Sequence, residues 1–110
     1  MGINYQRHRV AVDIAKGFRQ LQKADAAFNK GNVDSSVNHM NKGLNLFYMA
    51  ENRAAKVEGD AYNRAGKEIN KGNDELNKCF DAYANGNDGS AENHYANAMD
   101  DYDRALELIG

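Results

Sequence analysis

The sequence of 110 residues contains no proline, no tryptophan and a single cysteine. Without proline, the commonest residue that breaks a helix is absent. The lone Cys79 excludes an internal disulfide and a cysteine-rich zinc site. Because Cys79 falls on an apolar stripe, we expect it to be a small buried side chain.

Long apolar runs and a strong charge of either sign are also missing. No run approaches the roughly 20 apolar residues of a membrane span, and the first residues show no signal-peptide pattern. We therefore expect a soluble, cytoplasmic protein with no membrane partner. The net charge of −2 argues against a broad nucleic-acid surface, which requires a basic face. The length suits one domain over residues 1–110.

What the chain does contain is an internal repeat. Residues 28–40 resemble residues 83–95, at an offset of 55 positions, which is half the chain. A repeat of this kind fixes the unit of the fold, so we predict two tandem helical hairpins over 1–55 and 56–110. Over all 55 pairs, 13 residues are identical, namely Arg9/Arg64, Ile14/Ile69, Lys16/Lys71, Gly17/Gly72, Leu21/Leu76, Lys23/Lys78, Ala27/Ala82, Gly31/Gly86, Asn32/Asn87, Ser35/Ser90, Asn38/Asn93, His39/His94 and Ala50/Ala105.

Apolar residues that recur every three or four positions predict four helices. The first runs from about Asn4, as N-cap, to residue 29, with a stripe that starts at Ile3. The second begins at 34 or 35, the third covers 60–84 and the fourth starts near 90. A turn at 58–60 separates the copies, although a single helix of about fifty residues is an alternative. Short connections predict an all-α, antiparallel up-down-up-down four-helix bundle. We expect its core to include the stripe residues Phe28, Val33, Val37, Tyr83 and Tyr95.

In each copy, the turn glycine is followed by a small residue five positions on, a large one nine on and a small one twelve on. These residues are Ser36, Met40 and Gly43 after Gly31, and Ala91, Tyr95 and Ala98 after Gly86. The pattern resembles the second half of a tetratricopeptide repeat. That resemblance implies a scaffold that binds peptides or partner proteins, although the period is 55 residues rather than about 34.

No grouping of serine, histidine and aspartate, or of cysteine and histidine, has a catalytic spacing, and no glycine-rich phosphate loop is present. The sequence therefore predicts a protein that is not an enzyme and has no cofactor. The related histidines His39 and His94 are the one candidate pair for a metal or small ligand, because paired imidazoles bind metals. The alternative is that each histidine pairs with its neighbouring asparagine or with the adjoining helix.

The two halves differ most clearly at five positions where the first is apolar and the second polar. We expect these positions to lie away from the core or on its flanks, and apolar surface often marks a binding face. The prediction is an interaction module that binds itself, as a homodimer, or a protein partner through the first hairpin. Its binding residues would be Val12, Phe18, Leu46, Tyr48 and Met49.

Overall fold

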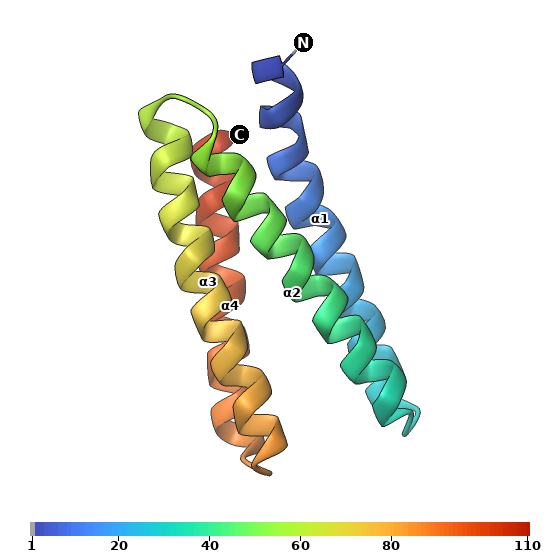
Figure 1. The fold of residues 1–110 in the computed structure, drawn as a ribbon. Coiled ribbons are helices and arrows are strands. Elements are labelled where there is room, and N and C mark those ends of the chain that lie inside the picture. Colours follow the sequence, from blue (N-terminus) through green and yellow to red (C-terminus); the bar gives the residue numbers. More distant parts are fainter. Residues whose placement is uncertain (1) are drawn as a thin grey trace.

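The computed structural model describes the backbone of residues 2–110 and the side chains of residues 5–110. It contains four helices and, among the described residues, no strand: α1 (Gly2–Asn29), α2 (Val33–Ala55), α3 (Asp60–Ala84) and α4 (Asp88–Ile109). Successive helices run in opposite directions, and α1 packs on α2 as α3 packs on α4 (Figure 1). The chain is therefore an all-α four-helix bundle of two hairpins, as the periodicity predicted.

The two hairpin turns are built alike. Gly31 and Gly86 adopt positive φ angles of 79° and 76°, and each follows the end of a helix. The next helices are capped by Asn32 and Asn87, whose side-chain oxygens accept hydrogen bonds from backbone amides three residues on, each at 3.2 Å. The predicted starts of the second and fourth helices are therefore late by one or two residues, because the preceding asparagine is itself a good cap.

At the other end of the molecule, α2 ends at Ala55 and α3 begins at Asp60. Gly59 lies between them with φ of 123°, a conformation that favours glycine. The alternative of one continuous helix is thus wrong. The first helix starts at Gly2, before the expected cap Asn4, and the side chains of Ile3 and Asn4 lie outside the described residues.

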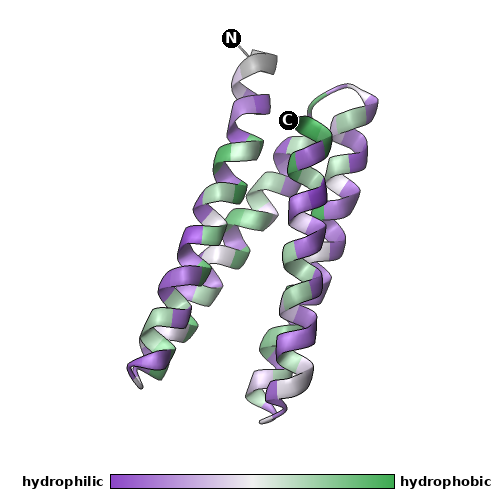
Figure 2. Ribbon diagram, turned by 180° about the vertical axis from the view of Figure 1, so that it is seen from behind, coloured by the Kyte–Doolittle hydropathy of each residue, from purple (hydrophilic) through white to green (hydrophobic). Residues whose placement is uncertain are grey.

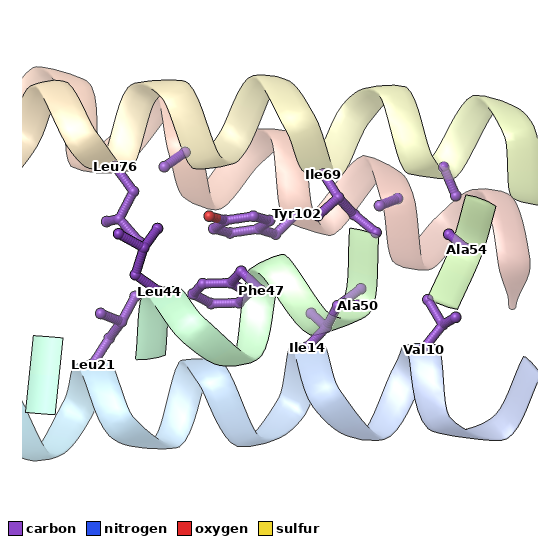
Figure 3. Close-up of a cluster of buried hydrophobic side chains, with 13 residues drawn as sticks. Val10, Ile14, Leu21, Leu44, Phe47, Ala50, Ala54, Ile69, Leu76 and Tyr102 are labelled. Atoms are coloured by element: carbon purple, nitrogen blue, oxygen red, sulfur yellow. The ribbon is translucent and has the colours of Figure 1, made fainter. Parts of the chain in front are cut away.

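The centre of the core is a pair of stacked rings (Figure 3). Phe47 of α2 and Tyr102 of α4 lie 3.9 Å apart between centroids, at 13° between planes. Both are fully buried, and each ring covers a glycine of its own hairpin. A Cβ added at Gly17 would come within 2.5 Å of Phe47, and one at Gly72 within 2.6 Å of Tyr102. These mid-helix glycines let the helices of each hairpin approach closely around a large ring.

Phe18 and its counterpart Asn73 both contact this stack. Phe18 is half-buried and meets Phe47 and Tyr102 edge-on, with centroids 5.8 Å and 6.1 Å away. Asn73 is buried and accepts a 2.7 Å hydrogen bond from the Tyr102 hydroxyl. Asn73 is therefore the hydrogen-bond partner that the buried Tyr102 hydroxyl needs. Phe47 has no hydroxyl, so the corresponding position in the first half can hold the apolar Phe18.

Polar contacts join the hairpins through α2 and α3. Glu51 accepts hydrogen bonds from Asn70 and Asn73, and the Tyr48 hydroxyl accepts one from Asn77 at 2.8 Å. By contrast, α1 and α4 touch only slightly. The hairpins consequently diverge toward the ends that carry the Gly31 and Gly86 turns, which both views show (Figures 1 and 2).

Candidate functional site

The divergence of the hairpins leaves a groove between their turn ends. Its volume is about 670 Å³, and all four helices contribute to its walls. Along α1 the lining runs from Leu21 to Phe28, and along α4 from Asp88 to Tyr95. Seven residues of helix correspond to about 10 Å, so the groove is about two helical turns long.

The groove walls carry most of the large apolar side chains that the described residues expose. Five of the eight line it, with exposed fractions from 36 to 57 %: Phe28, Val33, Val37, Tyr83 and Tyr95. We expected these stripe residues in the core, and that prediction is wrong. The periodicity correctly gives their face of the helix, but the opposite hairpin covers them only in part.

The sequence held a signal for this divergence in the sizes of the stripe residues. Midway along the bundle, Gly17, Gly43 and Gly72 permit close packing of the two helices within each hairpin. Toward the turns the stripes carry the much larger Phe28 and Tyr83. These two rings, 55 positions apart, meet across the groove with centroids 6.3 Å apart. Bulky residues that face each other from the two hairpins near the turns favour hairpins that separate there.

The groove floor is apolar, and its cysteine thiol is unreactive. Leu21, Ala24 and Cys79 are buried there, and burial raises the pKa of the Cys79 thiol to about 11. A thiol with so high a pKa is protonated at neutral pH and is a poor nucleophile. The buried Ser36 hydroxyl donates to the Ala24 carbonyl at 2.9 Å, which ties α2 to α1. The floor thus offers a surface for packing.

Of the charged side chains that the structure describes, only carboxylates line the groove. Asp25 comes from the first hairpin, and Asp88 and Glu92 come from the second. All three are exposed, and none forms an ion pair within the described side chains. We call these three residues the acidic rim.

The acidic rim acts on the tyrosines of the groove. Burial raises the pKa of Tyr95, and the charge of Asp25 raises it further. Burial also raises the pKa of Tyr83, and Cys79 and then all three rim carboxylates add to that effect. The groove is therefore apolar inside and negative at its edge.

The five residues predicted to bind a partner lie outside this groove. Val12 and Leu46 are half-buried, and Tyr48 and Met49 are each 40 % exposed. Phe18 packs against the central ring stack, and the Tyr48 hydroxyl bonds to Asn77. Among the five, Tyr48 and Met49 are thus equally the most accessible, although the Tyr48 hydroxyl is held by Asn77. Binding through these residues stays a prediction.

The two candidate histidines each pair with the other helix of their own hairpin. His39 Nδ1 lies 2.7 Å from Gln20 Oε1, and His94 Nδ1 lies 2.5 Å from Glu75 Oε2. Among the described residues, no three or more histidine, cysteine, aspartate or glutamate side chains gather as they would to hold a metal. Neither histidine lines the groove. The metal alternative thus has no ligand cluster to support it.

Comparisons with models of protein families, with curated proteins and with solved structures found no match. The resemblance to tetratricopeptide repeats therefore rests on the turn pattern alone. Within the described part of the chain, no helix is both long enough and apolar enough to cross a membrane.

Proposed function

We propose that this protein is a non-enzymatic interaction module that holds an apolar helical segment of a partner protein in the groove between its hairpin turns. One observation carries the proposal: five large apolar side chains are exposed around a single hollow. Exposing large apolar side chains to water is unfavourable. A contiguous exposed group of them therefore marks a binding surface.

The exposed apolar surface supplies part of the free energy that specific binding requires. Fully burying one such side chain contributes about 1.5–3 kcal/mol. The five groove residues are roughly half exposed, so covering them supplies about 5 kcal/mol before the cost of association. Micromolar affinity requires about 8 kcal/mol net. Further contacts along the rim must therefore contribute.

A helix is the occupant that suits the walls. The groove is about two helical turns long and is bordered by helices on both sides. An amphipathic helix that lies in an apolar groove uses residues at i, i+3 or i+4, and i+7 as anchors. Two turns supply three such anchors, which matches the extent of the exposed apolar lining.

A photoreactive residue identifies the binding surface directly. We would place p-benzoylphenylalanine at Tyr95 in the groove and, as a control, at Tyr5, which is exposed on α1 and does not line the groove. Crosslinking in the cells that make this protein should join one protein to the Tyr95 position and spare the Tyr5 position.

The captured protein must then bind the purified chain, and Val37→Asp must weaken that binding at least tenfold. Val37 is 47 % exposed, so this change should spare the fold. The double variant Val12→Lys with Met49→Arg tests the first-hairpin surface in the same assay. Binding that is lost only in the double variant would move the site to that surface, and equal crosslinking at both positions would refute the groove.

A further inference from the structure

The chemistry of the groove edge narrows the class of partner. We infer that the groove selects an amphipathic helix whose apolar face is flanked by lysine or arginine, bound between Asp25 on one side and Asp88 and Glu92 on the other. The inference rests on the proposed function, because it describes the occupant of the same groove.

The charge distribution around the lining is one-sided. Among the side chains of residues 5–110, all three charged ones that line the groove are acidic, and no lysine or arginine lines it. The lysines next in sequence to lining residues, Lys23, Lys42 and Lys78, are exposed and lie outside the groove. Because the overall charge is only −2, this concentration of acid is local rather than a property of the whole surface.

The three carboxylates are also free to engage a partner. None of them is used in an ion pair within the described side chains, whereas Asp13, Glu68 and Asp101 elsewhere in the bundle each have a basic partner. Placed on both hairpins, the acidic rim faces a bound helix from two sides. A helix with basic residues on both flanks of its apolar face matches this arrangement, and complementary charge favours correct partners and fast association.

A second copy of this chain is a poorer occupant. Two copies that met groove to groove would bring the two acidic rims together, and the like charges would repel each other. The apolar lining alone would then have to hold the dimer against that repulsion. A separate basic helix avoids this conflict.

Two designed peptides of 18 residues test the inference. Both carry leucine at i, i+3, i+4 and i+7 on one face. One has lysine and the other glutamate on the flanks. Fluorescence anisotropy of the labelled peptides gives the dissociation constant for each chain at 0.05 M and 0.5 M salt, because salt weakens exposed charge pairs.

Three variants locate the binding. The rim variant, Asp25→Asn with Asp88→Asn and Glu92→Gln, removes the three groove charges. Its matched control, Asp74→Asn with Asp100→Asn and Asp103→Asn, removes three exposed charges elsewhere on the surface. Val37→Asp disrupts the apolar wall. Thermal melting of each variant checks that the fold is intact.

The inference predicts that the lysine peptide binds at least tenfold more tightly than the glutamate peptide at low salt. The rim variant should weaken it at least fivefold, and the control variant by less than twofold. Equal losses in the rim and control variants would show attraction to net charge only and would overturn the inference.

Other outcomes separate this inference from the proposed function. If both peptides bind equally and Val37→Asp weakens both, the charge preference fails while the groove function stands. If Val37→Asp leaves the binding of both peptides unchanged, both proposals fail. A concentration-dependent dimer in sedimentation velocity that the lysine peptide does not dissociate would place a second copy in the groove and overturn the inference.

Discussion

Replacing Gly72 by alanine should destabilise the bundle, although the same change elsewhere in α3 should stabilise it. The new Cβ would lie 2.6 Å from Cε1 of Tyr102. The ring cannot move aside, because Phe47 stacks on its other face and its hydroxyl is bonded to Asn73. Either the stack or the helix spacing must therefore shift.

The two opposing contributions can be weighed. Alanine is favoured over glycine in a helix interior by about 0.5–1 kcal/mol. Overpacking a well-filled core costs about 1–3 kcal/mol. With the ring held on both faces, we expect the clash to win, with a net loss of about 1–2 kcal/mol.

Gly66→Ala is the matched control, six residues earlier in the same helix. A Cβ at Gly66 would lie 3.6 Å from the Ala54 side chain, which is an ordinary contact. We expect this variant to gain about 0.5–1 kcal/mol. The two alanine variants should thus differ by about 2 kcal/mol, or about 8–16 °C in melting temperature.

Urea unfolding followed by circular dichroism at 222 nm measures both variants against the wild type. The midpoint should fall for Gly72→Ala and rise for Gly66→Ala, with the same slope. Equal midpoints for the two variants would refute the packing of Tyr102 on Gly72, since both changes would then act through helix propensity alone.

Three further predictions concern single side chains. Asp13 is fully buried between Arg9 at 3.1 Å and Arg53 at 2.9 Å, so Arg53→Met should cost about 3 kcal/mol in urea unfolding. Adding Asp13→Leu should recover most of this loss, and no recovery would show that Arg53 acts through packing. The folded pKa of Cys79, about 11, lies above the ordinary value of 9.0, so its contribution to stability is complete below pH 9 and is lost as the pH rises toward 11. Cys79→Ala should therefore lose less stability than the wild type between pH 8 and pH 10.5, and equal losses would contradict the burial of the thiol. If His39 and His94 bind a metal ion, zinc, nickel or copper should raise the melting temperature of the wild type and leave that of His39→Ala unchanged. Equal shifts in both chains would exclude metal binding by these histidines.

The fold could be derived from the sequence because its main signals are local. The apolar periodicity predicted the four helices, and Gly31 and Gly86 predicted the two hairpin turns. The 55-residue offset predicted that the chain divides into two hairpins. The burial of Ile14, Ile69, Leu21 and Leu76 follows from the same pattern. The helices and turns follow from neighbours along the chain, and the division into two hairpins follows from the repeat.

The candidate site could not be derived in the same way, because it depends on how far apart the two hairpins lie. Stripe residues at the turns and at the centre have the same periodicity, yet Tyr102 is fully buried while Tyr95, two turns earlier on the same helix, is 36 % exposed. Comparing the halves predicted Phe18 on a flank of the core but misjudged the residue that corresponds to it. Its polar counterpart Asn73 indicated surface, whereas Asn73 is buried and serves the Tyr102 hydroxyl.

The distribution of contacts within the bundle has a consequence for how the chain folds. Most contacts form inside α1–α2 and α3–α4, and each of these pairs is closed by a turn of only three residues. Closing so short a loop costs little entropy, and chains dominated by local contacts fold in microseconds to milliseconds. Each hairpin should therefore form early, and docking of Phe47 on Tyr102 should be the slow step. Substitutions at that ring stack should then slow folding, whereas substitutions in the groove should leave the folding rate unchanged.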